Sequence, residues 1–151
     1  MRTTFLAALL VFAAALVPRP AHADGASAPR GDTGSVTGLE LPRFVSLRAE
    51  EGKLRRGPGV THKVDWVYVR AGVPLQVTAE FGNWRRVRDA DGVGGWMHGA
   101  LLSGRRTAIV RDDSAPMRRA PAPNAPVVAR IEAGVIGRLL TCRPDWCRLS
   151  A

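Results

Sequence analysis

The sequence predicts an all-β fold of short strands, and three observations support this prediction. Apolar and polar residues alternate from Leu75 to Phe81, which is the period of a strand with one buried face. Turn-forming residues occur at Gly82-Asn83 and in the Asp- and Gly-rich segment 89–94, with the β-prone segment 84–88 between them. No segment after residue 23 keeps the period of a helix. Strands joined by tight turns are therefore expected, followed by one more short strand at 95–98.

The N-terminus has the order of a secretory signal peptide. Arg2 precedes an apolar run from Phe5 to Val17, and a small-x-small sequence ends at Ala23. A retained membrane anchor is the alternative, but the run is shorter than the roughly 20 residues that a membrane span needs. We expect a cleaved signal peptide at 1–23, no transmembrane anchor after cleavage, and a periplasmic or secreted protein.

The next segment, 24–40, is predicted to be a disordered leader. It consists mainly of Gly, Ser, Ala, Thr and Asp, with too little apolar surface to offset the entropy of ordering. The whole chain has a formal net charge of +9, which becomes +7 once Arg2 and Arg19 are removed with the signal peptide. A positive charge favours attraction to polyanions such as cell-wall polymers.

An internal repeat divides the remaining chain into two units. Order and hydrophobic pattern are kept between the copies, at a separation of 63 residues for the first segment and 62 for the others. The matching segments are LRRGP at 54–58 and MRRAP at 117–121, AGV at 71–73 and 133–135, and NW at 83–84 and DW at 145–146. The expected domains are 41–104 and 105–151.

The second unit is expected to be incomplete at its C-terminal end. The counterparts of Gly95, Trp96, Met97 and Leu101 would fall at about positions 157 to 163, by the 62-residue separation. Either the chain is truncated, or this unit lacks its closing strand.

Several short motifs of the first unit follow one another in a characteristic order. They are KLRRGP at 53–58, a glycine before a strand at Gly72, Asn83-Trp84, and Gly95-Trp96 followed by Leu101-Leu102. In this order and spacing the chain resembles the bacterial SH3 (SH3b) family, well over 44–103 and partially over 109–151. The resemblance implies two tandem SH3-like barrels, the second one unfinished. Two departures are Gly52, where the family has an apolar residue, and Ala120, which replaces the motif glycine of the second unit.

The resemblance also implies a binding site. In SH3-like barrels the loop after the first strand, here 49–63, and the hairpin loops surround a shallow groove. Which of Trp66 and Val67 faces inward is left open, because bulges shift the alternation. Cross-strand aromatic contacts are expected for Trp84 and Trp96, which serve either packing or ligand stacking. The implied ligand-binding residues are Arg55, Arg56, Trp66, Tyr68, Trp84 and Trp96.

Cysteine and histidine usage indicates that the protein is not an enzyme. Cys142 and Cys147 fit the two ends of a hairpin, and export would place them where disulfides persist, so a disulfide is predicted. Neither a zinc site nor a nucleophile with an oriented base has suitable spacing. The two histidines of the expected mature chain, His62 and His98, are expected at the solvated surface. We expect no catalytic residues, no metal and no cofactor.

Two functions remain after catalysis is set aside. The leading hypothesis is an exported module that binds peptidoglycan or another cell-wall polymer, the partner class that the resemblance implies. The alternative is a periplasmic protein–protein interaction or scaffold module, in which the unfinished second unit borrows a strand from a partner or a second copy. Nucleic-acid binding rests on charge alone, and export argues against it.

Overall fold

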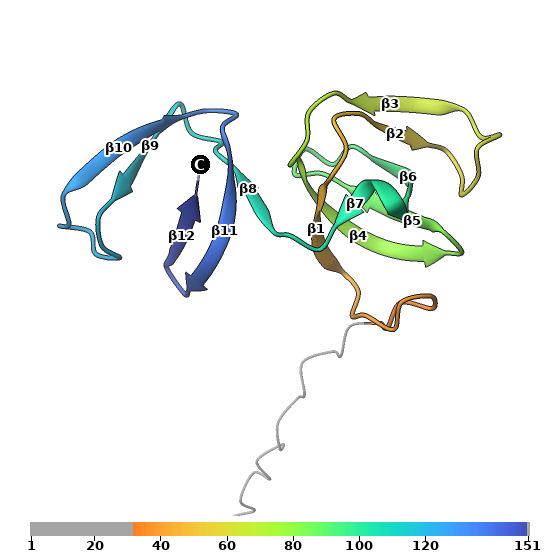
Figure 1. Ribbon diagram of the computed structural model, residues 1–151, viewed down its shortest axis with the longest axis horizontal. Helices are drawn as coiled ribbons and strands as arrows, with labels where there is room; N and C mark the ends of the chain where they lie inside the picture. The colour runs from red at the N-terminus through yellow and green to blue at the C-terminus, as the bar shows by residue number, and fades with distance from the viewer. Residues whose placement is uncertain (1–31, 151) are drawn as a thin grey trace, which may run out of the picture. The chain divides into compact units, whose positions relative to one another are not determined.

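The computed structural model describes residues 32–150 (Figure 1). The expected signal peptide at 1–23 and the first part of the expected leader, 24–31, lie outside the described residues. The described chain is all-β, with twelve strands and a single 3₁₀ turn, and no α-helix occurs in residues 32–150. The predicted fold class is confirmed.

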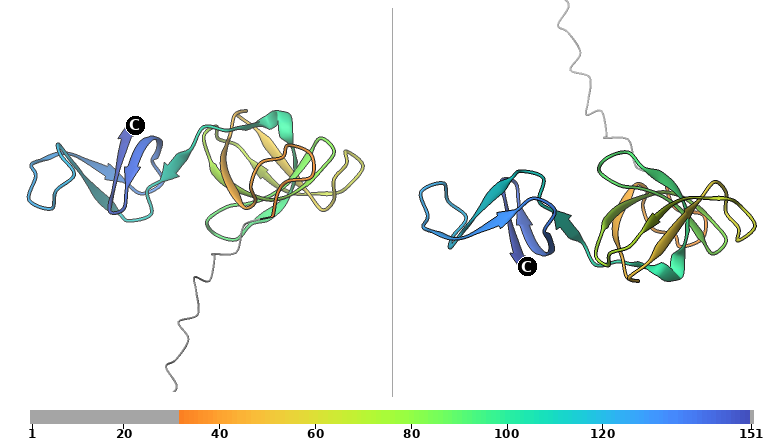
Figure 2. Two further views of the ribbon diagram at one scale, coloured as in Figure 1. Left: turned by 90° about the horizontal axis from the view of Figure 1, so that it is seen from below. Right: turned by 90° about the horizontal axis from the view of Figure 1, so that it is seen from above.

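The first barrel is a seven-stranded antiparallel sheet in the order β3-β2-β6-β5-β4-β1-β7. Figure 2 shows this sheet curled around one interior. Its elements are β1 (Arg43–Leu47), β2 (Gly52–Arg55), β3 (Val64–Tyr68), β4 (Pro74–Phe81), β5 (Trp84–Arg88), β6 (Gly94–His98), the 3₁₀ turn η1 (Gly99–Leu101) and β7 (Leu102–Ser103).

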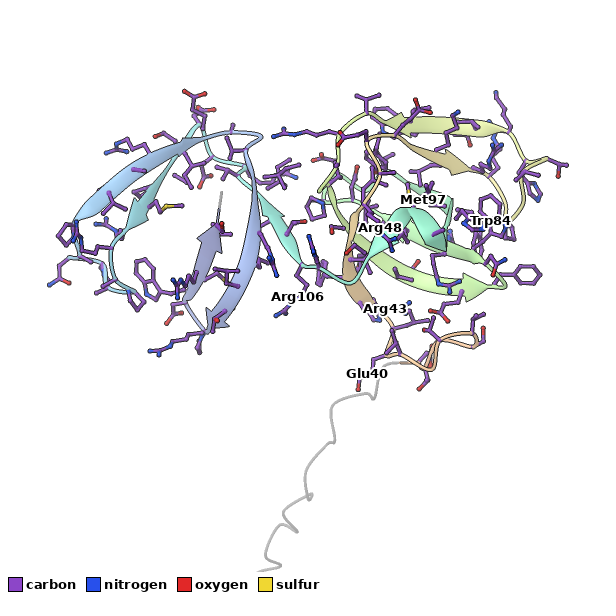
Figure 3. All side chains as sticks on the ribbon, viewed as in Figure 1. Glu40, Arg43, Arg48, Trp84, Met97 and Arg106 are labelled. Carbon is purple, nitrogen blue, oxygen red and sulfur yellow. A yellow bond between two sulfur atoms is a disulfide. The ribbon has the colours of Figure 1, made fainter. Side chains whose placement is uncertain are left out.

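The core of the first barrel comes from alternate positions of nearly every strand. Met97 of β6 points into this interior (Figure 3). Six side chains are less than 2% exposed: Leu47, Leu54, Leu75, Val77, Val87 and Met97. The two predicted turns are present, with positive φ at Gly82 (49°) and Gly92 (85°), a conformation that glycine adopts without strain.

The second module consists of two small antiparallel sheets, β10-β9 and β12-β11-β8. Within residues 105–150, Ala125 is the single buried hydrophobic residue, at 8% exposure. The predicted disulfide is confirmed, because Cys142 and Cys147 lie directly opposite each other in the β11–β12 hairpin and are bonded. The strands are β8 (Thr107–Ile109), β9 (Ser114–Arg118), β10 (Val127–Glu132), β11 (Ile136–Arg143) and β12 (Trp146–Ser150).

Part of the expected disordered leader is ordered. Residues 33–40 form a loop that closes with a bridge between Thr33 and Glu40. The carboxylate of Glu80, on β4, accepts hydrogen bonds from the backbone N–H groups of Val36 and Thr37 at 2.9 and 2.8 Å, and from the Thr37 hydroxyl at 2.7 Å.

The prediction of disorder is therefore wrong for 32–40. Arg43, beside the same loop (Figure 3), completes the attachment, because its guanidinium donates to Glu80 at 2.6 Å. The prediction of disorder was based on the composition of the segment, which indicates only how much apolar surface the segment itself can bury. The composition of a segment cannot indicate that a carboxylate more than forty residues away accepts hydrogen bonds from its backbone N–H groups.

Candidate functional site

The register of three neighbouring strands places Arg55, Trp96 and Arg86 in one row. Trp96 lies opposite Arg55 on β2 and opposite Arg86 on β5. Residues directly opposite in an antiparallel pair share one face of the sheet. The neighbours Leu54 and Val87 are each 1% exposed and belong to the core, so the row lies on the outer face.

A shallow groove of about 780 Å³ runs along this row. Gly94 and Gly95 also line it. A Cβ on Gly95 would lie 2.9 Å from the carbonyl oxygen of Arg55, closer than real Cβ atoms approach, so only glycine lets β6 lie this near to β2. The charged and aromatic lining residues are Arg55, Arg56, Asp65, Arg86, Arg88 and Trp96.

The groove is strongly cationic, with four guanidinium groups and one carboxylate. That carboxylate, Asp65, accepts two hydrogen bonds from Arg56 Nε, at 2.8 and 2.9 Å. Hydrogen bonding to Asp65 and the negative charge of Asp65 raise the pKa of the Arg56 guanidinium above its ordinary value. Arg55 donates to the carbonyl oxygens of Val60 and His62 at 2.9 and 2.7 Å and so holds the loop between β2 and β3.

The other two arginines differ in their availability to a ligand. Arg88 donates to the side chain of Gln76 at 2.9 Å. The Arg86 guanidinium is exposed and has no hydrogen-bond or ion-pair partner among residues 32–150. Arg86, opposite Trp96 in the register, is therefore a cation of the groove that can bind an incoming anion without breaking a contact within the described residues.

Tyr68 belongs to the core of the barrel and does not line the groove. Its side chain is 8% exposed, and its hydroxyl donates to Asp89 Oδ2 at 2.8 Å. Burial first, and then the hydrogen bond and charge of Asp89, raise the pKa of Tyr68. Asp89 Oδ1 also accepts from the N–H groups of Asp91 and Val93, so this contact organises the β5–β6 turn.

Of Trp66 and Val67 on β3, the register shows that Trp66 faces inward. Trp66 lies opposite Leu54 and on the same side of β3 as Tyr68, whose ring it meets edge-on at 6.4 Å. Its side chain is nevertheless 48% exposed, because β3 is the edge strand of the sheet. Trp66 does not line the groove.

Trp84 makes the expected cross-strand aromatic contact, but with His98 instead of with Trp96. The rings of Trp84 and His98 lie opposite each other on β5 and β6 and meet edge-on at 5.5 Å. His98 also accepts from the N–H of Ala100 at 3.3 Å and so caps η1. The expectation that His98 is only a solvated surface residue is wrong, while His62 is exposed as expected.

The structure thus brings together three of the six expected ligand-binding residues: Arg55, Arg56 and Trp96. Sequence reasoning missed Asp65, Arg86 and Arg88. A signal for the two arginines was present, because a strand that points Val87 inward points both of its neighbours outward. For Asp65, on an edge strand next to a register shift, no local signal existed.

Comparison with known proteins agrees with this architecture. Residues 48–104 and again residues 111–151 match the family model of the bacterial SH3 domain. The chain belongs to the bacterial SH3 domain family. No curated protein matches the chain.

The first bacterial SH3 segment contains the whole groove, and the second corresponds to the module of two small sheets. Bacterial SH3 domains are binding modules, often related to the cell wall, and are generally non-catalytic.

In 32–150, no cluster of three or more His, Cys, Asp or Glu side chains is placed to hold a metal ion. No helix in this part of the chain is long and apolar enough to cross a membrane.

Proposed function

We propose that this protein is an exported, non-catalytic bacterial SH3 module that binds peptidoglycan, and in particular its stem peptides, through the groove of the first barrel. The observation that carries the proposal is the row of Arg55, Trp96 and Arg86, in which the tryptophan lies between the two arginines in the strand register and the Arg86 guanidinium has no partner among residues 32–150. The order of the N-terminal residues and the disulfide, typical of oxidising compartments, support a periplasmic or secreted location.

The chemistry of the groove fits an extended ligand with carboxylates. A guanidinium binds a carboxylate through two parallel hydrogen bonds, and an indole face accepts aliphatic or sugar surface beside it. Stem peptides present both kinds of group. A volume of about 780 Å³ accommodates a short peptide segment and falls within the usual size of ligand sites.

The groove has little capacity for proton transfer, which supports a binding function. Its single carboxylate, Asp65, already accepts two hydrogen bonds from Arg56. A general acid or base must be able to exchange a proton with the substrate, and a guanidinium stays protonated at any physiological pH.

Co-sedimentation with purified peptidoglycan sacculi tests the proposal. The mature chain, Asp24 to Ala151, should be retained at about 0.15 M salt, and Arg86→Ala and Trp96→Ala should each weaken retention by about tenfold. Trp84→Ala and Arg130→Ala are the matched controls, since both positions lie outside the groove and should leave retention unchanged.

Circular dichroism of each variant verifies that it is folded. Equal loss of retention in Arg130→Ala and Arg86→Ala would show that charge attraction, and not the groove, accounts for binding. Absence of retention for the unaltered chain would contradict peptidoglycan as the ligand.

A further inference from the structure

The hairpin β11–β12 of the second module repeats the hairpin β4–β5 of the first barrel. The two hairpins lie 62 residues apart, and each has one register shift, at the equivalent position of its first strand. Strands β11 and β12 are therefore the counterparts of β4 and β5, residue by residue. Where the outward side chains of the two hairpins differ, the difference is not required by the strand pairing itself.

Strand register places three cross-strand pairs of β11–β12 on one face, which we call the hairpin face. Alternate residues of β12 point to the same side, and each shares that side with the residue directly opposite on β11. The other side carries the disulfide and the pair of Leu139 and Leu149, both partly buried. The pairs of the hairpin face are Arg138 with Ser150, Thr141 with Arg148, and Arg143 with Trp146.

The hairpin face is basic, because it holds three exposed arginines. None of Arg138, Arg143 and Arg148 has a hydrogen-bond or ion-pair partner among residues 32–150. Arg148 is the diagonal neighbour of the other two, and diagonal neighbours in an antiparallel pair lie only about 7 to 8 Å apart. Asp145, in the turn, is the single acidic residue of 136–150.

The first barrel does not have this cluster of charges. Arg138 occupies the position that Gln76 has in the first barrel. Arg143 occupies the position of Phe81, and of the three arginines only Arg148 has a basic counterpart. Like charges this close together repel one another, so the cluster costs some stability and is not explained by the fold. An anionic ligand would explain it.

Apolar side chains accompany the arginines. In a β-bulge two residues of one strand oppose one residue of its partner, so Leu140 and Thr141 both lie opposite Arg148. The Leu140 side chain is 42% exposed, and Trp146, opposite Arg143, is partly exposed. A soluble phosphate polymer offers nothing apolar to these two side chains. A phospholipid bilayer offers phosphate groups and acyl chains together, and tryptophan is enriched at its interface.

We propose that the hairpin face of the second module binds the surface of a membrane that contains anionic phospholipid. The guanidinium groups of Arg138, Arg143 and Arg148 donate charge-assisted hydrogen bonds to lipid phosphates. Leu140 and Trp146 enter the level of the headgroups beside them. The disulfide, on the opposite side of the hairpin, holds the two strands in register under this face. The groove of the first barrel takes no part in this contact.

The charge of the module gives the expected strength of binding. Residues 105–150 contain nine arginines against four acidic residues, and one of these arginines, Arg111, forms an ion pair. Each basic residue near an anionic membrane strengthens partitioning by about fivefold, so three arginines supply about a hundredfold. This attraction is screened over about 8 Å at physiological ionic strength, so binding should be reversible and should weaken with added salt.

Co-sedimentation of the mature chain with lipid vesicles tests the proposal. Vesicles with about 30% phosphatidylglycerol in phosphatidylcholine should retain the chain at about 0.15 M salt, and vesicles of phosphatidylcholine alone should not. Replacement of all three arginines of the hairpin face by glutamine, as Arg138→Gln, Arg143→Gln and Arg148→Gln, should weaken partitioning by about a hundredfold. The corresponding triple lysine variant keeps the charge and should retain most of the binding.

A control variant of equal net charge separates the hairpin face from general charge attraction. Circular dichroism verifies that each variant is folded, and retention of both triple glutamine variants on peptidoglycan sacculi should be unchanged. The control replaces three exposed arginines outside the hairpin, and its partitioning should change by less than about fivefold. Its substitutions are Arg105→Gln, Arg119→Gln and Arg130→Gln.

The apolar contribution separates a membrane surface from a soluble polyanion. Leu140→Ser should weaken partitioning by about threefold, whereas Val128→Ser, at a position of β10 that is 50% exposed, should not. Soluble polyphosphate serves as the competing ligand. Displacement of the chain from vesicles by polyphosphate, together with no effect of Leu140→Ser, would overturn the membrane and identify a phosphate polymer as the ligand.

Three further results would overturn the proposal. They are equal weakening by the two triple glutamine variants, binding to phosphatidylcholine alone that matches binding to anionic vesicles, and parallel loss of vesicle and sacculus binding in the hairpin variant. If the triple variant of the hairpin does not fold, single substitutions decide. Arg148→Gln should then weaken partitioning by about fivefold and Arg130→Gln should not, and equal effects of the two would overturn the hairpin face.

Discussion

At the scale of single residues, Glu80 shows how one side chain can organise a distant loop. Its side chain has no exposed surface, and burial alone would raise its pKa. Hydrogen bonds from Thr37, Arg43 and Val36 to the charged form overcome this effect and lower the pKa of Glu80 to about 2. The ionised carboxylate is therefore part of the fold.

The stability of the protein should depend on pH through Glu80. Its pKa in the folded protein, about 2, lies below its ordinary value of 4.5. Its contribution is therefore fully present above about pH 4.5 and is lost as the pH falls toward 2. At neutral pH, Glu80→Gln should lower the free energy of unfolding by about 1 to 3 kcal/mol, because it weakens several hydrogen bonds to a charged acceptor.

Urea denaturation of the two proteins between pH 7 and about pH 2 measures this difference. The gap between the unaltered protein and Glu80→Gln should narrow as the pH falls through this window. Glu51→Gln, a change at an exposed carboxylate that is paired only with Lys53, is the control and should have little effect. A constant gap would contradict the assignment.

At the scale of elements, the close approach of β6 to β2 builds the groove. The two strands are joined through the pair Arg55 and Trp96. Gly95, the residue before Trp96, has the Arg55 carbonyl oxygen and the Leu54 Cβ within 3.3 Å of where its own Cβ would be. The glycine of the Gly-Trp motif is therefore required by packing between strands.

Gly95→Ala should destabilise the first barrel and weaken retention on sacculi. The added methyl group meets backbone, which cannot move aside without displacing β2 from β6, so we expect a loss of about 1 to 3 kcal/mol in the free energy of unfolding. Gly104→Ala is the matched control, because a Cβ there meets nothing within 4 Å. Equal unfolding curves for both variants would refute this account of the groove.

At the scale of the whole molecule, the two modules differ in how much core they have. The first contains six side chains that are less than 2% exposed, whereas the hydrophobic residues of the second, Ala125 excepted, remain partly exposed through residue 150. Stability within one protein varies with such burial. The disulfide supplies the second module with a covalent constraint on the β11–β12 hairpin.

Native-state hydrogen exchange should therefore distinguish the modules. Amides of β4 and β5 should exchange at least about tenfold more slowly than those of their counterparts β11 and β12. Equal protection of both modules in the free protein would contradict the difference in core.

Local patterns in the chain were sufficient for much of this description. Alternation over 75–81, the turns at 82–83 and 89–94, the repeat and the pairing of Cys142 with Cys147 all depend on residues close in sequence or on a fixed spacing. The sequence by itself therefore determined the all-β class, the tandem organisation and the disulfide.

Only the tertiary structure decided what depends on contacts between distant segments. The loop 33–40 is ordered because Glu80 satisfies its backbone. Arg86 lines the groove, while Trp84 does not, because strand register sets the face of each residue and its partner across the sheet. The placement of β9 and β12 in separate sheets follows from sheet order, which no local pattern reports.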